Sequence, residues 1–235
     1  MCCVCCSRLK KIWCWIVSDH PKKSMNETEK LLFSIKITSK CRYQASVRLS
    51  LYNRFCFFTT TILSLGLIFV PLMQIAEVKL YFDTQIINAM QVFLAVSVLV
   101  FSNKISSSDY AIRAQNLNVC GDALKKLARM ISSEMMQNEE STKKKELTQE
   151  QIKKYTDEYS NITEKYENHI RTDYKQTLFE AGNERITGLR WISLKMQIAG
   201  RYSLAYFIPT CLIIFEIALI FDMLGIFNLF YIFHE

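Results

Sequence analysis

The residues of this sequence whose chemistry stands out are polar side chains within apolar segments. Seven of them form the candidate set: Thr60, Ser64, Gln74, Asn88, Gln91, Ser102 and Glu216. In helices, at about 100° per residue, the first three share one face and the next three share another. Each face either forms hydrogen bonds between helices or, in an oligomer of several copies, lines a water-filled path, because polar groups that face lipid are costly.

Glu216 presents the same choice more sharply. A carboxylate in the middle of a membrane costs about 2.5–3.5 kcal/mol on insertion scales. Glu216 and Asp222 are six residues apart, so they point in different directions on a helix. We expect Glu216 to contact a lumen or a neighbouring helix, and Asp222 to mark the membrane exit. The alternative is a shallow or packed helix whose acids reach water.

Catalytic chemistry finds little support in the sequence. The three histidines, His20, His169 and His234, are far apart in the chain. No glycine-rich phosphate loop, spaced set of metal ligands or nucleophile motif is present. We therefore expect a protein that is not an enzyme and that needs no cofactor or metal.

The apolar segments that carry the candidate residues are long enough to cross a membrane. As helices, residues 55–76 would extend about 33 Å and residues 84–103 about 30 Å, against a hydrocarbon core of about 30 Å. Neither segment contains a charged residue. We predict an all-α integral membrane protein with a two-helix transmembrane hairpin over 55–103. Segment 203–233 contains two acids, and whether it spans stays open.

The cations flank these segments and predict the orientation of the chain. Arg42, Arg48 and Arg54 precede the first segment, whereas Lys104 and Arg113 follow the second. Since positive residues near membrane crossings stay in the cytoplasm, we predict a multi-pass protein of the cell inner membrane with a cytoplasmic N-terminus. The net charge of +7 would also suit nucleic acid. The cations form no stripe, however, so we expect contact with the lipid bilayer and no direct nucleic-acid binding.

The remaining segments predict cytoplasmic helices. Residues 25–54 form a basic helix leading into the membrane, and residues 104–180 form a helical hairpin whose second helix begins at a capping box, "TQEQ" at 148–151. Apolar and tyrosine side chains at helical spacing form its seam: Tyr110, Leu117, Leu124, Tyr155, Tyr159 and Tyr166. Residues 181–235 hold a basic turn and the C-terminal hydrophobic helix.

Residues 1–24 differ from the rest and contain five of the nine cysteines. The crowded thiols lack the two spaced pairs of a zinc ribbon, and they suit acylation beside Lys10 and Lys11. The alternative is that Met25 is the true start and that this stretch is a leader or extension outside the domain. All three interpretations stay open.

Three features together resemble the SLATT family, the two-transmembrane effector domains associated with nucleotide-sensing conflict systems in prokaryotes. They are the basic-aromatic stretch "KCRYQASVRL" with "NRF" at 53–55, the pair of apolar segments joined by a short loop, and "YAIRAQNLNVC" at 110–120. The resemblance covers about residues 30–180. The further helical region and the last apolar helix resemble the subgroup found beside reverse transcriptases.

The resemblance implies a membrane effector of an anti-phage system that oligomerises, forms a pore or disrupts the membrane, and causes cell death or arrest when activated. Its activating partner would be encoded nearby, as a nucleotide-signal enzyme or a reverse transcriptase. The alternative function is a non-conducting anchor that docks a cytoplasmic partner through its helical hairpin.

Overall fold

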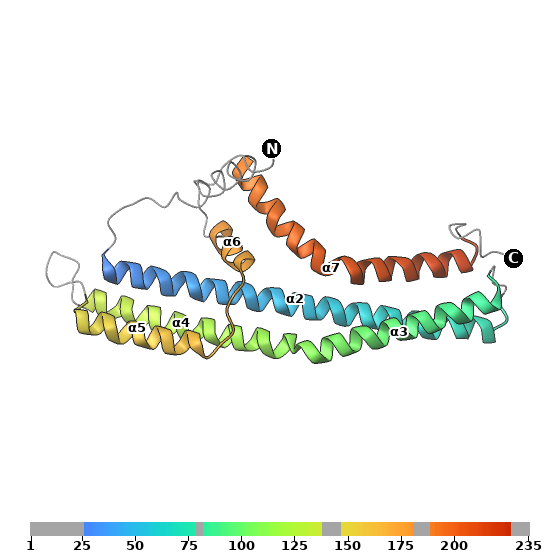
Figure 1. The fold of residues 1–235 in the computed structure, drawn as a ribbon, viewed down its shortest axis with the longest axis horizontal. Helices are drawn as coiled ribbons and strands as arrows, with labels where there is room; N and C mark the ends of the chain where they lie inside the picture. Colours follow the sequence, from blue (N-terminus) through green and yellow to red (C-terminus); the bar gives the residue numbers. More distant parts are fainter. Residues whose placement is uncertain (1–25, 79–81, 138–146, 181–188, 227–235) are drawn as a thin grey trace, which may run out of the picture.

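The computed structural model describes residues 26–78, 82–137, 147–180 and 189–226, and most of these residues are helical (Figure 1). The helices are α2 (Glu27–Ile75), α3 (Thr84–Ser108), α4 (Tyr110–Gln137), α5 (Gln149–Glu164), α6 (Arg171–Glu180) and α7 (Leu189–Met223). The prediction of an all-α fold is confirmed. The Cys-rich stretch 1–24 and the greater part of the predicted basic turn, 181–188, lie outside the described residues.

Helix α2 is the axis of the molecule. Its 49 residues extend about 73 Å. Glu27 and Glu29 lie in its first turn, where negative charge complements the helix dipole. Helices α3 and α4 run back along α2 in the opposite direction (Figure 1). One long helix therefore joins an apolar half to a charged half without a hinge at their boundary.

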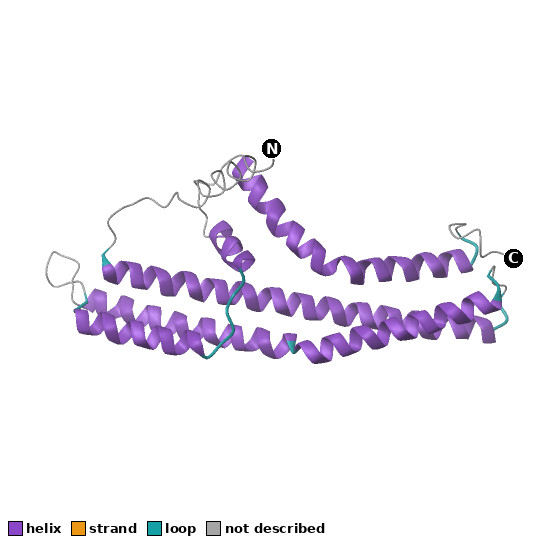
Figure 2. Cartoon of the chain, in the orientation of Figure 1, coloured by secondary structure: helices purple, strands orange, loops and turns teal. Residues whose placement is uncertain are grey.

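Two aspartates shape the antiparallel partner of α2. The side chain of Asp83 caps α3 by accepting a hydrogen bond from the Gln85 backbone N–H at 3.1 Å. Asp109 separates α3 from α4 with a φ of 47°, a left-handed conformation that Asp adopts more readily than most residues. Figure 2 shows this break between two helices that continue in nearly the same direction. Both helices therefore reach α2.

The charged half forms what we call the polar bundle: residues 27–54 of α2 with α4, α5 and α6. Its core contains Ile35, Leu124, Leu127, Ile131 and Tyr155. The predicted capping box is confirmed, with Thr148 accepting from the Gln151 backbone and Gln151 accepting from the Thr148 backbone.

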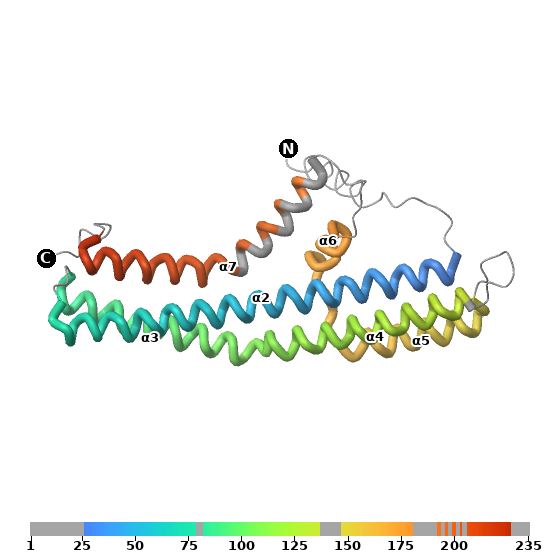
Figure 3. The backbone as a smooth tube through the Cα atoms, turned by 180° about the vertical axis from the view of Figure 1, so that it is seen from behind, coloured from blue at the N-terminus to red at the C-terminus, as the bar shows by residue number. Residues whose placement is uncertain are grey.

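The second helix of the predicted cytoplasmic hairpin is interrupted. Helix α5 ends at Glu164, and residues 165–170 lead to α6, which lies on the opposite side of α2 from α5 (Figure 3). A new helix starts here because the Asp173 carboxylate accepts the Ile170 backbone N–H at 3.0 Å, which satisfies one of the free donors at the start of a helix.

The apolar half is what we call the membrane segment: α2 from residue 55, α3, and α7 from residue 206. Within the described residues, three helices are long and apolar enough to cross a membrane, so α7 qualifies beside the predicted pair. Large apolar side chains here face outward, among them Phe57, Leu65, Leu99 and Ile214. Such a surface would drive aggregation in water, but it is suited to lipid.

Helix α7 contains Pro209 and is bent along its course (Figure 1). A proline inside a helix removes one backbone hydrogen bond and kinks it. Beyond the bend, α7 packs along the hairpin, and Leu219 and Met223 meet Val70, Phe82 and Ile87. The end of α7 therefore lies near the turn between α2 and α3.

Candidate functional site

Three predicted polar residues meet near the turn of the membrane hairpin. Gln91 donates from Nε2 to Gln74 Oε1 at 2.8 Å, and Gln74 donates from Nε2 to Asn88 Oδ1 at 3.5 Å. These bonds join α2 to α3. Side-chain amides that pair across helices satisfy each other where lipid offers no partner. Gln74, Asn88 and Gln91 therefore form a polar layer within one chain.

The other residues of the two predicted faces are not part of this layer. Thr60 donates its hydroxyl to the Cys56 carbonyl at 2.9 Å, and Ser64 donates to the Thr60 carbonyl at 2.8 Å. Both hydroxyls thus bond to the backbone of their own helix, a common arrangement for Ser and Thr in helices. Ser102 is exposed near the other end of α3.

Glu216 lies against Gly66 at the contact between α7 and α2. It is 1% exposed, and neither carboxylate oxygen has a hydrogen-bond partner within the described residues. A Cβ built on Gly66 would lie 1.8 Å from Glu216 Oε1, so only glycine leaves room for this side chain. The two residues line a cavity of about 420 Å³ whose other lining residues are apolar. Asp222 is also buried, one residue before the end of α7.

Aromatic contacts attach α7 to the hairpin in the part of the helix that precedes Glu216. The Tyr206 ring meets Tyr52 and Phe55 edge-on, with centroids 5.5 and 4.9 Å apart. Phe215 meets Phe93 at 5.8 Å in the same manner. Such pairs contribute about 0.5–1.5 kcal/mol each beyond the area they bury. Helix α7 is therefore packed along the hairpin as a third helix that is long and apolar enough to cross a membrane.

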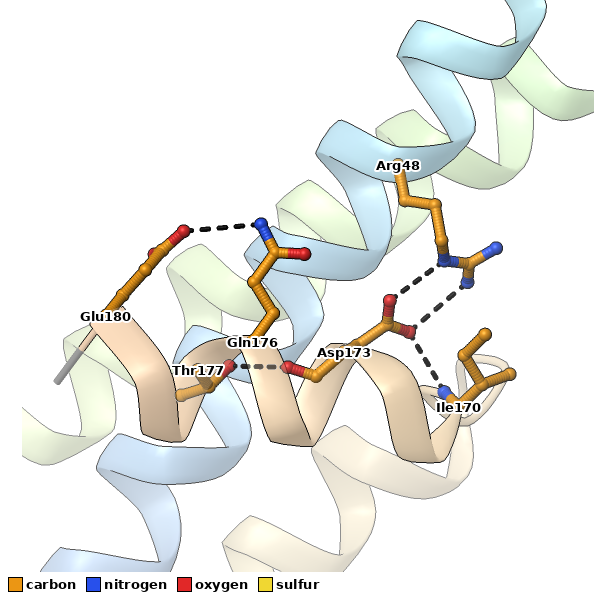
Figure 4. A network of polar contacts seen from close by, with 6 residues as sticks. All are labelled: Arg48, Ile170, Asp173, Gln176, Thr177 and Glu180. Atoms are coloured by element: carbon orange, nitrogen blue, oxygen red, sulfur yellow. Dashed lines mark hydrogen bonds and ion pairs between the residues drawn. The ribbon is translucent and has the colours of Figure 1, made fainter. Parts of the chain in front are cut away.

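The basic residues that predict orientation fall into two groups. Arg48 forms an ion pair with the fully buried Asp173, with its Nε 2.8 Å from Oδ1 (Figure 4). Arg42 is 1% exposed and donates from Nη2 to Asn168 Oδ1 at 3.0 Å, and Arg113 pairs with Glu167 at 2.8 Å. Arg54 and Lys104, which are closest to the membrane segment, are exposed.

The partners of the first three arginines come from a short stretch of chain. Glu167 and Asn168 lie in the connection 165–170, and Asp173 lies in the first turn of α6. Gln44 of α2 also donates a hydrogen bond to Glu180 at the other end of α6. Polar contacts along one side of α2 thus hold α6, the element that precedes α7.

The predicted seam residues of the polar bundle lie at helix contacts. Leu117, Leu124 and Tyr155 are buried, and Tyr166 packs against the core. The Tyr159 hydroxyl is 2.9 Å from Thr38 Oγ1, and the Tyr110 ring meets Tyr52 at 5.0 Å. The last two contacts extend the seam to α2.

The described side chains form no group of three or more His, Cys, Asp or Glu residues that could hold a metal ion. The membrane segment contains a polar layer and a buried carboxyl. The polar bundle contains a short stretch, residues 167–173, whose side chains bond to three arginines.

Two residues of this arrangement were not predicted. Gly66 is one of six glycines in the sequence and lies in an apolar run. The need for a glycine at this position becomes clear only from the position of α7 against α2. Asp173 follows Tyr166 and Ile170 in a pattern that indicates a continuous helix, and no local signal marks it as the partner of Arg48.

The fold and these sites define a class: an α-helical membrane protein built on a two-helix hairpin, with a third apolar helix against it and a polar bundle at one end. The sequence model of SMODS and SLOG-associating 2TM effector domain family 5 (SLATT_5) matches residues 24–221, and the chain belongs to this family. The resemblance in the sequence is thereby confirmed, whereas the association with reverse transcriptases stays a prediction. Comparison with curated proteins and with solved structures finds no match.

Proposed function

We propose that this membrane effector oligomerises through its membrane segment and, on activation, opens a conducting path or breaches the bilayer of a prokaryotic cell. The result would be death or arrest of the cell in defence against phage. Activation would require a partner encoded nearby, a nucleotide-signal enzyme or a reverse transcriptase. No catalytic step and no cofactor enters this proposal.

One observation supports the conducting path above all. Glu216 is a membrane carboxyl whose oxygens have no partner among the described residues, and an unsatisfied polar group in hydrocarbon is costly. Intramembrane acids of this kind face bundle interiors or water-filled cavities. Three helices enclose no water-filled path, so the proposal requires several copies.

The orientation that we propose follows from the exposed cations. Arg54 and Lys104 flank the apolar runs on the side of the polar bundle, and positive residues at such positions favour the cytoplasm. The polar bundle would then lie in the cytosol at the inner membrane, where it can meet an activating partner.

Membrane potential tests the proposal in cells. Induction together with the activating partner should depolarise cells that carry a potential-sensitive dye. Because a pore needs its polar lining, Gln91→Leu and Glu216→Leu should each reduce the leak at unchanged expression and location. An unchanged potential, both alone and with the partner, would count against a pore.

The second candidate is a non-conducting anchor that docks a cytoplasmic partner through the polar bundle. It is favoured by the way in which Gln74, Asn88 and Gln91 bond to one another within one hairpin, because such bonds serve packing without any lumen. An anchor should tolerate Gln91→Leu and Glu216→Leu without loss of function, provided that the protein still folds.

A further inference from the structure

Arg42 is a buried cation that no described carboxylate neutralises. Its Nη2 bonds to Asn168, whereas Nε and Nη1 are buried and have no hydrogen-bond partner in the described part of the chain. The two acids nearest in the chain to Asn168, its partner, are in ion pairs already, Glu167 with Arg113 and Asp173 with Arg48. A buried charge without a counter-ion costs several kcal/mol, so this position calls for a further negative group.

His169 adds a donor beside Arg42. Its Nδ1 is buried and has no partner among the described residues. Burial, together with the charge of Arg42, lowers the pKa of His169, so the neutral ring predominates and carries one N–H. The Cys41 thiol adds no negative charge, because burial raises its pKa. The Asp173 carboxylate also faces the ring, with its charge balanced by Arg48.

We propose that Arg42 and His169 form a binding site for a small oxyanion, with phosphate as the test ligand. The Nη1 group of Arg42 and the Nδ1–H of His169 would donate to its oxygens. The unprotonated oxygens of an oxyanion accept hydrogen bonds, and a hydrogen bond in which the donor or the acceptor is ionised is about twice as strong as a neutral one.

The position of the site decides between two sources of phosphate. Arg42 lies 12 residues before Arg54, the last charged residue before the apolar run, which corresponds to about 18 Å along α2. The headgroup layer adds only about 5–8 Å to each side of the hydrocarbon core. A lipid phosphate therefore does not reach Arg42, and the ligand comes from solution.

The anion would add a contact between α2 and the connection that leads to α6. Arg42 belongs to α2, and His169 lies in the connection that leads to α6. Bound phosphate would therefore strengthen the attachment of this connection to α2, and with it the attachment of the helix that precedes α7. Exchange of amide hydrogens in residues 165–173 should slow when phosphate binds.

Equilibrium dialysis of the full chain in detergent, with radiolabelled phosphate, tests the site. We expect saturable binding of one ion per chain, in the millimolar range or tighter, as a few charge-assisted hydrogen bonds permit. Arg42→Met should weaken binding at least tenfold, and His169→Leu several-fold. The matched control is Arg54→Met, which removes the same charge from an exposed position and should leave binding unchanged.

The alternative occupant is water, and it predicts no saturable uptake at about 10 mM phosphate, a concentration above the expected range. That result would overturn the proposal, as would equal binding by the Arg42→Met variant. Displacement by chloride as effective as displacement by sulfate would overturn the oxyanion assignment. If Arg42→Met does not fold, as judged by circular dichroism, Arg42→Lys serves: it keeps the charge but loses the fork of donors, so several-fold weaker binding is expected and unchanged binding contradicts the site.

Discussion

At the scale of single residues, the same side-chain type has different environments along α2. Arg54 is exposed, Arg48 pairs with the buried Asp173 carboxylate, and Arg42 is buried. Removal of the ion-pair partner costs several kcal/mol more stability for a buried arginine than for an arginine exposed to water. Charge counted along the sequence therefore says little about the contribution of each residue to stability.

The two ion pairs of the polar bundle should respond differently to neutralisation of their acid. Asp173→Asn leaves Arg48 unpaired at a buried contact and should destabilise α6 by about 3 kcal/mol, the lower end for buried pairs, since Arg48 is partly exposed. Glu167→Gln, the matched control, should cost less than about 1 kcal/mol because that pair is exposed. Hydrogen exchange in α6 measures both, and equal costs would contradict the assignment.

The stability of the polar bundle should fall in mild acid because of His169. Burial and the charge of Arg42 lower its pKa, so the folded form binds a proton less readily than the unfolded chain, which titrates near pH 6.5. Stability is then complete above about pH 6.5 and decreases below it, by at most about 1.4 kcal/mol per pH unit for one proton. Denaturation of His169→Gln at a series of pH values should show a shallower decrease than in the wild type; an identical profile would falsify this role.

At the scale of elements, α7 is the helix whose position depends most on specific contacts. It meets the hairpin through the Tyr206 and Phe215 rings, through Leu219 and Met223, and through the contact between Glu216 and Gly66. Apolar attraction does not drive helices together in lipid, so close packing and polar contacts must do so. At Gly66 the Glu216 side chain occupies the space that a Cβ would need.

Gly66→Ala should displace the Glu216 side chain, because a Cβ would lie 1.8 Å from its Oε1 and 2.7 Å from its Cδ. We expect a loss of about 1–3 kcal/mol, as for other overpacked contacts. The cost should fall by more than about 1 kcal/mol when Glu216 is also replaced by Ala, since the two positions are coupled. Thermal unfolding of the four proteins in detergent provides the cycle.

Gly200→Ala is the matched control for that cycle. Gly200 lies in α7, the helix of Glu216, and a Cβ there meets nothing within 4 Å, so the substitution should be neutral or stabilise the helix by up to about 1 kcal/mol. Similar losses at both glycines would mean that the contact with Glu216 is unimportant.

At the scale of the whole molecule, one helix crosses the boundary between lipid and water. Because α2 continues from the membrane segment into the polar bundle, a change in the bundle can reach the membrane without a flexible linker. Helix α6 gives a second route, since it is held on α2 and precedes α7. We infer that an activating partner would act on the polar bundle.

The orientation makes a direct prediction for the intact protein. Tags at Met25 and near Ser141 should be reached from the same, cytoplasmic side of the membrane, since the hairpin returns the chain to its side of origin. Accessibility to a protease in inverted and right-side-out vesicles measures this. Extraction of the protein by alkaline carbonate, or tags on opposite sides, would refute the hairpin.

The sequence by itself determined the elements that depend on local chemistry. Two uncharged runs at membrane length predict the hairpin, since each residue adds its own transfer free energy. The capping box at Thr148 and Gln151 is confirmed for a similar reason, because its partners are three residues apart. Charge at the ends of the runs also indicates an orientation without any knowledge of packing.

Only the tertiary structure decided which distant residues meet. The contacts of Gly66 with Glu216, of Arg48 with Asp173 and of Arg42 with Asn168 join residues more than a hundred positions apart. No periodicity encodes such pairs, because each depends on where a connection turns and on which face of α2 a later helix covers. The break at 165–170 is the clearest case. Helical spacing predicts one continuous helix, but the buried Asp173 carboxylate pairs with Arg48 of α2 and accepts the Ile170 backbone N–H, so that a second helix starts there.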